Sequence, residues 1–359
     1  MNPGDSKEKK LDKFEGLACP VPLSEYPRVL LAHGGGGKLS QQIIQKMIVP
    51  QFDNEYLKPL HDGAVFTQDG SRFAFSTDSY VVSPLFFPGG DIGRLAVHGT
   101  INDLAMCGAR PLFLSAAFII EEGFSMDDLW RVIVSMQEAS ARAGVPLVTG
   151  DTKVVDRGKG DGIFVNTSGI GVVPKGVNVT SGGAEIGDVV LVNGPLAVHG
   201  VAIMSVRQGL EFQTSIQSDT APLHTLVEAM LAVSKNIHVL RDPTRGGLAS
   251  SLNELADASK VGVEIEETLI PLTEPVKGAC EILGLDPLYV ANEGKLIAFV
   301  SPGDAEKVLD AMRKHPLGKE SVAIGKVVAD HTRTVVMKTR IGGSRVVDMM
   351  SGEQLPRIC

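Results

Sequence analysis

From Val29 onward, short apolar segments typical of strands alternate with longer segments typical of helices, and this alternation restricts the chain to an α/β fold. A stretch rich in glycine and turn-forming residues, PKGVNVTSGGAEIG, interrupts the pattern near residues 175–187. At 359 residues, the chain is long enough for two compact domains of ordinary size. We therefore predict a mobile N-terminal extension (1–28), two α/β domains (29–180 and 181–342) and a C-terminal tail (343–359).

Local signals place helices and strands in the first predicted domain. Asp91 can cap a helix that runs to about Cys107, and Gly108 is placed to end it. Ser125 begins a sequence that resembles a capping box, and the helix that follows should end at Gly144. A further helix is expected at 39–47, and strands are expected at 72–77, 112–120, 145–149 and 163–173.

The second predicted domain shows the same kinds of signal. Strands are expected at 188–193, 296–300, 322–328 and 334–338, and helices at 196–208 and 221–234. Asp242 before Pro243 suits an N-cap followed by the first helical residue, so another helix is expected to begin there. After Ile341 the chain has two glycine breaks and no helical period, which predicts a flexible tail that exposes Cys359.

Charge and cysteine spacing exclude several classes of function. The formal net charge of −8 argues against nucleic-acid binding, although Mg²⁺ can still mediate between acidic side chains and a nucleotide. No apolar run approaches the roughly 20 residues that cross a bilayer, and the polar start lacks a secretory signal, so we expect a cytoplasmic location without membrane contact. The four cysteines are scattered, which signals neither a zinc site nor a disulfide framework, and Cys19 is expected to be a free exposed thiol.

Several carboxylates lie where sites form in α/β domains, at or just after strand ends. Asp62, Asp78 and Asp151 occupy such positions, and Asp103 lies on the helix capped by Asp91, with Asn102 beside it. Converging oxygens of this kind would hold Mg²⁺ and, through it, nucleotide phosphates. The alternative is that each aspartate caps a helix or a turn.

A glycine run, His33-Gly-Gly-Gly-Gly-Lys38, precedes the first expected helix. Gly35 and Gly36 would let backbone N–H groups approach a phosphate closely, and Lys38 stands at the helix start, where an anion is favoured. The run lacks the spacing of a Walker A loop, and a flexible loop without a ligand is an equal alternative. No dinucleotide fingerprint follows a strand, so a Rossmann oxidoreductase is disfavoured.

Two further residues could transfer protons. Lys153 in GDTKVVD and Glu293 in NEGK would serve if burial moved their pKa values toward neutrality. Taken alone, they are better explained by a surface lysine and a solvated glutamate.

Six segments, taken in order, resemble the hydrogenase-maturation carbamoyl dehydratases, the HypE family: TDSYVVSPLFFPGGDIGRLAVHGTINDLAMCGARP, SAAFIIEEGF, VTGDTKVVDRG, DPTRGGLASSLNE, NEGK and LPRIC. The resemblance runs from about residue 29 to residue 359. The first segment and the terminal LPRIC are highly specific, whereas DPTRGG is shared with a wider ATP-using superfamily. That superfamily includes aminoimidazole ribonucleotide synthetase, selenophosphate synthetase and thiamine-phosphate kinase.

The resemblance implies a fold like that of aminoimidazole ribonucleotide synthetase and a homodimer whose N-terminal domains pair into a barrel of strands. It implies that ATP and Mg²⁺ are bound in the groove of these domains. The implied reaction is ATP-dependent dehydration of a carbamoyl group on the C-terminal cysteine to a thiocyanate, which supplies the cyanide ligand of the [NiFe]-hydrogenase iron. A carbamoyltransferase, HypF, would load the cysteine, and a HypC–HypD scaffold would receive the cyanide.

The resemblance also implies roles for single residues. Cys359 matches the cysteine that carries the substrate, and Lys153 and Glu293 match a pair that assists deprotonation. The positions that match metal and nucleotide ligands are Asp62, Asp78, Asp103 and Asp151, with Asn102 adjacent. The extension before Val29 is a departure that the family pattern does not require.

We expect Cys359 to be a carrier of ordinary or low thiol reactivity, because its own terminal carboxylate disfavours the thiolate. The tail is long enough to present the thiol outside the protein and then to lay it beside ATP. Two other functions stay open: another ATP-using kinase or cyclo-ligase of the superfamily, which has no need of LPRIC, and a non-enzymatic scaffold that uses the terminal cysteine to bind a metal or partner.

Overall fold

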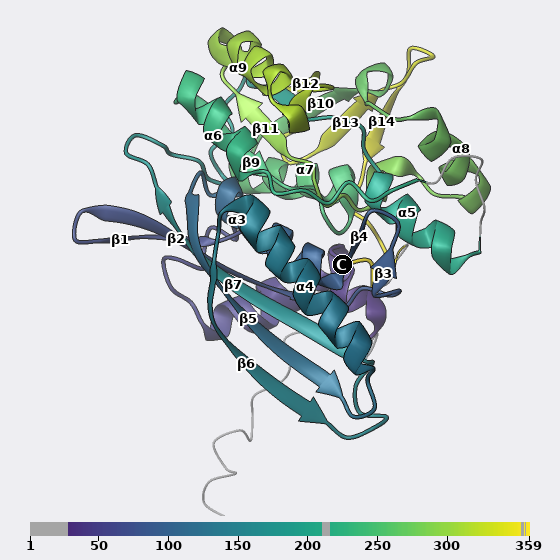
Figure 1. Ribbon diagram of the computed structural model, residues 1–359. Helices are drawn as coiled ribbons and strands as arrows, with labels where there is room; N and C mark the ends of the chain where they lie inside the picture. Colours follow the sequence, from purple (N-terminus) through teal and green to yellow (C-terminus); the bar gives the residue numbers. More distant parts are fainter. Residues whose placement is uncertain (1–27, 210–215, 353–354, 356) are drawn as a thin grey trace, which may run out of the picture.

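The computed structural model describes residues 28–209, 216–352, 355 and 357–359 (Figure 1). The predicted extension therefore lies outside the described residues apart from Arg28, and so does Cys19. Within the described ranges, no helix combines the length and the apolar character that a membrane span requires. The described residues form two large sheets with helices packed on them and one small two-stranded sheet, so the predicted α/β class is confirmed.

The first sheet has five strands in the order β1-β2-β7-β5-β6, and its neighbours are antiparallel except for β5 with β6. The strands are β1 (Ala64–Gln68), β2 (Ser71–Tyr80), β5 (Arg110–Glu121), β6 (Leu147–Val155) and β7 (Ile163–Val173). Side chains along β7 alternate strictly between buried and half-buried, because successive residues of a strand face opposite sides of the sheet. The buried side packs on α3 (Ile92–Met106) and α4 (Met126–Ala143), as Figure 1 shows.

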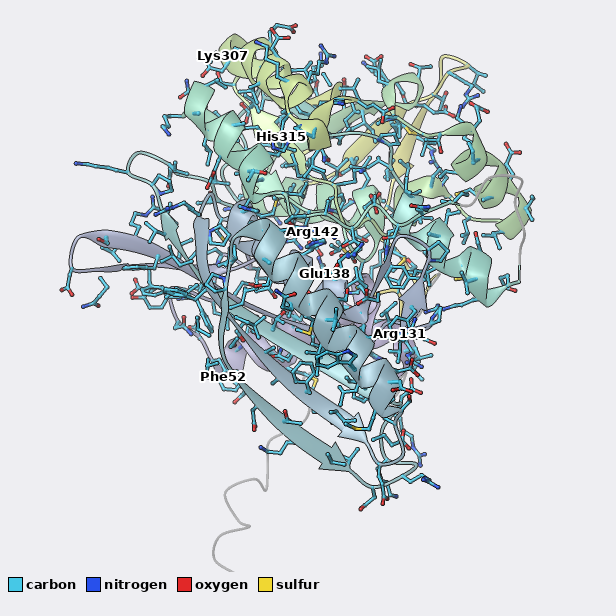
Figure 2. The ribbon with its side chains drawn as sticks, viewed as in Figure 1. Phe52, Arg131, Glu138, Arg142, Lys307 and His315 are labelled. Carbon is cyan, nitrogen blue, oxygen red and sulfur yellow. The ribbon has the colours of Figure 1, made fainter. Side chains whose placement is uncertain are left out.

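Both helices begin and end where the capping residues predict. Asp91 accepts hydrogen bonds from the backbone amides of Gly93 and Arg94, and Ser125 accepts one from Asp128. Gly144 ends α4 in the left-handed conformation that glycine adopts without strain. The outer face of α4 carries charged residues beside exposed apolar ones such as Trp130. Figure 2 labels Arg131, Glu138 and Arg142 there, and Arg142 pairs with Glu138 one turn earlier.

The second sheet has seven strands in the order β14-β13-β10-β12-β8-β11-β9. The strands are β8 (Val189–Val192), β9 (Ile237–Arg241), β10 (Gly262–Glu266), β11 (Ile297–Val300), β12 (Val322–Val328), β13 (Val335–Lys338) and β14 (Ser344–Val347). The helices are α5 (Val198–Arg207), α6 (His224–Val233), α7 (Gly247–Ser259), α8 (Glu274–Leu283) and α9 (Pro302–Lys314). Leu104 and Ala105 of α3 share one apolar core with Leu226 of α6 and Leu240 of β9, so α3 lies between the two sheets.

Three expectations about the elements need correction. The helix expected at 39–47 is α1 (Lys38–Ile43), which continues as a wider π-turn (Ile44–Ile48) into α2 (Val49–Gln51). Pro50 explains the change, because it has no amide hydrogen to donate to the preceding turn. No helix begins at Asp242; α7 begins at Gly247, after Gly246 adopts a positive φ of 77°.

The tail is the third correction. Ser344–Val347 form β14 and pair with β13, although we expected no regular structure after Ile341. The described end of the chain is also enclosed: the C-terminus lies in the middle of the molecule, beside the short strands β3 (Phe86–Phe87) and β4 (Gly90–Asp91), as Figure 1 shows. Ile358 is buried within the core beneath the first sheet.

Packing of α3 against β2 gives a stability prediction. A Cβ at Gly99 would overlap the Tyr80 hydroxyl oxygen, so Gly99→Ala should lower the free energy of unfolding by about 1–3 kcal/mol. A Cβ at Gly278, inside α8, would meet no atom within 4 Å, so Gly278→Ala should raise stability by about 0.5–1 kcal/mol. Urea titration of both variants checks the pair, and equal effects would refute the packing argument.

Candidate functional site

Three carboxylates from three separate elements meet where α3 faces the second sheet. Asp62 precedes β1, Asp103 lies on α3, and Asp242 follows β9. One oxygen from each lies within 4.8 Å of the others. Ser76 on β2 donates a hydrogen bond to Asp103 Oδ2 (2.7 Å). Asp242 was expected to cap a helix, and the fold makes it a member of this acidic cluster instead.

Burial strongly affects the charge of the acidic cluster. It raises the pKa of Asp62 to about 6 against the opposing effect of Arg241, and it raises the pKa of Asp242 to about 8, with the charge of Asp62 adding to the rise. Burial and then the charge of Asp242 raise the pKa of Asp103 well above its usual range. A bound cation would reverse these shifts, because it stabilises the ionised carboxylates.

Arg241 joins the acidic cluster to helix α7. Its guanidinium lies 2.7 Å from Asp62 Oδ1 and 2.7 Å from Glu254 Oε2. Asp62 Oδ2, in contrast, is buried without a hydrogen-bond partner and is available to a ligand. Burial lowers the pKa of the neighbouring His61 to about 4, so its imidazole is neutral at pH 7 and adds no charge.

Strand register separates Asp151 from the other predicted ligands within one chain. Residues directly opposite each other in a sheet face the same side. Asp78 pairs with Thr167, Thr167 with Ala116, and Ala116 with Gly150. Asp151 follows Gly150 and therefore faces the opposite side from Asp78, so the prediction that all four aspartates converge is wrong for a single chain.

Lys153 shares the side of Asp151. Both side chains are exposed on β6, and Lys153 Nζ lies 2.6 Å from Asp151 Oδ2. Glu293, its predicted partner in proton transfer, is instead buried in the loop before β11. A single chain therefore does not bring Lys153 and Glu293 together.

Glu293 lies in a loop that three buried asparagines hold in place. Asn102 Nδ2 donates to the Glu293 carbonyl (3.3 Å), Asn193 Nδ2 to the Gly294 carbonyl (3.1 Å), and Asn292 Nδ2 to the Pro243 carbonyl (2.8 Å). Asn102 also bonds Ala221 and Leu223, so its amide serves the protein itself rather than facing a ligand as predicted. Burial, and then the charge of Asp242, raise the pKa of the Glu293 carboxyl well above its usual range.

The end of the chain is docked beside Glu293. The backbone amide of Val81 donates to the Cys359 carbonyl (3.1 Å), and that of Ser83 donates to the Arg357 carbonyl (3.2 Å). Cys359 is half-buried, so in this conformation it is not the exposed residue that we expected. Its thiol lies close enough to Glu293 for the charge of that carboxyl to affect the pKa of the thiol.

Electrostatics at Cys359 disfavour the thiolate. Burial raises the pKa of the thiol well above its usual range, and the charge of Glu293 adds to the rise, while Arg245 opposes it. The charge of a Cys359 thiolate is in turn the main cause of the raised pKa of Arg245. The expectation of low thiol reactivity therefore agrees with the docked geometry, for reasons that the tail sequence does not contain.

The glycine run lies against both Arg245 and the tail. Arg245 Nη1 donates to the Gly34 carbonyl (3.0 Å), and a Cβ at Gly36 would lie 2.8 Å from the Arg245 carbonyl oxygen. The Lys38 amide donates to the Met350 carbonyl (3.0 Å). Gly35 lines a small cavity with Arg245, Leu355 and Ile358. The run therefore contacts the segment that carries Cys359, and its predicted contact with phosphate stays a prediction.

Sequence reasoning missed Asp242, Arg241 and Arg245 as site residues. All three lie in or next to DPTRGG, which the structure places between the acidic cluster and Cys359. The motif itself pointed to a site, but its Asp-Pro pair also fits the start of a helix. Local sequence does not distinguish a site aspartate from an N-cap aspartate at this position.

The docked thiol gives a reactivity prediction. Without ATP, iodoacetamide at about pH 8 should alkylate Cys359 at least about tenfold more slowly than a peptide of residues 350–359, because burial raises the pKa of the docked thiol and leaves less thiolate to react. Peptide mapping by mass spectrometry measures both rates. Equal rates would show that the docked conformation is not the dominant one.

Comparison with known proteins gives two domain matches. Residues 60–173 match the N-terminal domain of AIR synthase related proteins, and residues 185–338 match the C-terminal domain of the same proteins.

Full-length relatives are also found. The chain is 56% identical over 333 residues to a protein of Cupriavidus necator named carbamoyl dehydratase HypE, with 92% of this chain and 95% of that protein covered. It is similar to a crystal structure of a HypE–HypF complex (TM-score 0.82, 49% identity, 86% of this chain and 99% of that chain). It is also similar to the hydrogenase maturation protein HypE in complex with ATP (TM-score 0.78, 48% identity, 92% and 100% covered).

Proposed function

Because the chain belongs to the HypE family of carbamoyl dehydratases, we propose that its ATP-dependent reaction acts on a carbamoyl group carried by Cys359. The enzyme is an ATP-dependent carbamoyl dehydratase of hydrogenase maturation. The observation that carries the assignment of Cys359 is the docked C-terminus, which places its thiol beside the buried Glu293 and Arg245.

The chemistry explains why ATP is needed. Converting –S–C(=O)–NH₂ to –S–C≡N removes an oxygen that leaves poorly, together with two protons from nitrogen. Transfer of the γ-phosphoryl group of ATP to that oxygen allows it to leave as phosphate, and the balance is S-carbamoyl cysteine plus ATP giving thiocyanate, ADP and phosphate. A base must accept the protons, and the protein must exclude water and orient the group.

Beside Cys359, Glu293 and Arg245 are the residues that can act as the base and stabilise the carbamoyl group. Glu293, once ionised, is placed to accept a proton from the carbamoyl nitrogen, and its raised pKa makes it a stronger base than an exposed glutamate. Arg245 is a cation beside the thiol and can stabilise negative charge that develops on the carbamoyl oxygen. The buried asparagines keep Glu293 in position.

We propose that Mg²⁺ is held by Asp62, Asp103 and Asp242. The donor set fits a hard cation, since all three donors are carboxylate oxygens within 4.8 Å and Asp62 Oδ2 is buried without a partner. When bound, Mg²⁺ would bind and neutralise nucleotide phosphate. The charge of Asp78 contributes to the raised pKa of both Asp103 and Glu293, so Asp78 lies close enough to act electrostatically on both.

Asp242→Asn should weaken Mg²⁺–ATP binding by about tenfold or more, because an amide is a poorer ligand than a carboxylate. The rise in melting temperature on adding ATP and MgCl₂ should shrink accordingly. Asp310→Asn, an exposed change on α9, is the matched control and should keep the full rise. An unchanged rise for Asp242→Asn would refute the assignment.

A homodimer is proposed through the outer face of the first sheet. Phe75, Phe113 and Ile119 are each nearly half exposed, and β6 is exposed over nearly its whole length. Asp151 and Lys153 stand on this same face, so pairing of two copies would bring them into the interface. Their roles as ligand and proton-transfer group therefore depend on the dimer.

The partners follow the family. A relative is solved in complex with HypF, and HypF is the partner expected to load the cysteine. Transfer of the cyano group to a HypC–HypD scaffold is part of the proposal, and the cytoplasmic location stays a prediction.

Intact-protein mass spectrometry tests the proposed function. The protein is carbamoylated with cyanate, which modifies thiols, and ATP with MgCl₂ is then added. Loss of one water from a species whose modification maps to Cys359 supports the proposal. No loss of water, or a loss that maps to another residue, overturns it.

A further inference from the structure

His199, near the start of α5, is fully buried and contacts the C-terminal segment that carries Cys359. Its Nε2 lies 2.8 Å from the Ile358 carbonyl oxygen, and its Nδ1 lies 2.7 Å from Ser218 Oγ. We propose that His199 is a positioning residue, which holds the backbone of Ile358 so that the next residue, Cys359, points its thiol toward Glu293. This inference rests on the proposed function of Cys359 as the substrate carrier.

The hydrogen-bond partners determine which nitrogen of His199 carries the proton. A carbonyl oxygen only accepts, so Nε2 must be the donor to Ile358. The neutral ring then offers Nδ1 as an acceptor for the Ser218 hydroxyl, whose oxygen accepts in turn from the Thr220 amide (3.2 Å). Phe87 packs edge-on against the ring at 5.6 Å between centroids. The imidazole is thus fixed in orientation and in tautomer.

His199 belongs to a set of contacts that hold consecutive carbonyls of the chain end. Arg207, at the other end of α5, donates to the Arg357 carbonyl, and Val81 donates to the Cys359 carbonyl. Arg357 Nε donates to the Val81 carbonyl (3.1 Å) and its guanidinium pairs with Asp161. Three successive carbonyls are therefore held, and His199 holds the middle one from inside the protein.

Loss of this contact should change the rate of dehydration and the rate at which solvent reagents modify the free thiol in opposite directions. Dehydration requires the carbamoyl group to stay within reach of Glu293, so loosening the backbone at Ile358 should slow it. Any reagent that approaches the thiol from solvent requires the chain end to leave, so the same loosening should speed reaction of the unmodified thiol. A general loss of structure would not be corrected by a substitution that restores one hydrogen bond.

Two amide substitutions separate the contact from the fold. The glutamine amide nitrogen reaches approximately the position of the imidazole Nε2, whereas the shorter asparagine places its amide near Nδ1, away from Ile358. His199→Gln should therefore keep the bond to the Ile358 carbonyl, and His199→Asn should lose it. His98→Asn is the control, because His98 is also buried and bonds Thr220 (3.1 Å), in the same loop as Ser218.

The experiment uses the full chain with Cys19→Ser, carbamoylated with cyanate and mixed with ATP and MgCl₂. The rate of water loss at the C-terminal peptide is followed by mass spectrometry, and iodoacetamide alkylation of unmodified Cys359 is measured in parallel. His199→Asn should slow dehydration about 10- to 100-fold, the effect of losing one buried hydrogen bond, and should speed alkylation. His199→Gln and His98→Asn should stay within about threefold of the parent in both assays.

Equal dehydration rates for His199→Asn and the parent would overturn the inference, and so would equal losses for the asparagine and glutamine variants. If His199→Asn does not fold, Ser218→Ala tests the same contact, since it removes the donor that fixes the tautomer, and it should shift both rates in the same directions. Failure of the proposed function is distinct, because the parent itself would then lose no water at Cys359.

Discussion

Replacing Cys359 with serine should abolish formation of the thiocyanate while leaving ATP binding and docking of the chain end intact. The hydroxyl differs from the thiol by one atom, and the backbone contacts of the last three residues involve only carbonyl groups. A hydroxyl is too weakly acidic to accept a carbamoyl group as a thiolate does. The expected readout is complete loss of the species that forms on carbamoylation and loses one water on adding ATP.

Cys280→Ser is the matched control for Cys359→Ser. Cys280 is buried in α8, and burial raises the pKa of its thiol to about 11, so it should neither be loaded nor needed. Retention of the water-losing species in Cys359→Ser would place the carrier elsewhere. Loss of the species in both variants would point to a defect in folding, which the melting temperature would reveal.

Glu293→Gln should lower the single-turnover rate of dehydration by about 10²–10⁴-fold, the usual contribution of a general base. The amide keeps the shape of the carboxyl but cannot accept the proton, and the loop should stay in place because the asparagine contacts reach backbone groups. In the wild type, the rate should rise with pH through the raised pKa of Glu293, because the ionised form is the base. The glutamine variant should lose this dependence.

The same substitution should raise stability at high pH. Because the pKa of Glu293 is raised in the folded protein, the folded state binds the proton more tightly than the unfolded state, and stability falls as pH rises through the folded pKa. Glu293→Gln removes this loss, so its melting temperature should exceed that of the wild type at about pH 8.5 and approach it at about pH 5. A slower reaction together with a more stable protein would indicate that Glu293 serves the reaction at the expense of stability.

Glu281→Gln is the control for Glu293→Gln, since Glu281 is exposed on α8. It should leave the rate, the pH dependence and the melting temperature unchanged. A full rate in Glu293→Gln would remove Glu293 from the proton transfer and leave the proposed base unidentified.

The sequence determined the local structure because its signals are local. Asp91, Ser125 and Gly144 fix the ends of α3 and α4 through hydrogen bonds within one turn of the chain. The strands predicted at 163–173 and 322–328 have the same bounds in the structure as β7 and β12. The segment TDSYVVSPLFFPGGDIGRLAVHGTINDLAMCGARP and the terminal LPRIC indicated the family for a similar reason, since each is a contiguous segment.

Only the tertiary structure decided which side chains meet. Alternation along a strand assigns residues to two faces, but which face receives Asp78 and which receives Asp151 depends on the register of β2, β7, β5 and β6. The same holds for Asp242, which became a member of the acidic cluster because β9 and α3 pack side by side.

The chain end shows the difference most clearly. From the sequence alone, Cys359 was predicted to be an exposed thiol of ordinary or low reactivity. The structure decided that Cys359 lies half-buried beside Glu293 and Arg245, held by backbone carbonyls that bond His199, Arg207 and Val81. Backbone carbonyls are the same in every sequence, so their partners are set by the elements that the fold places around them.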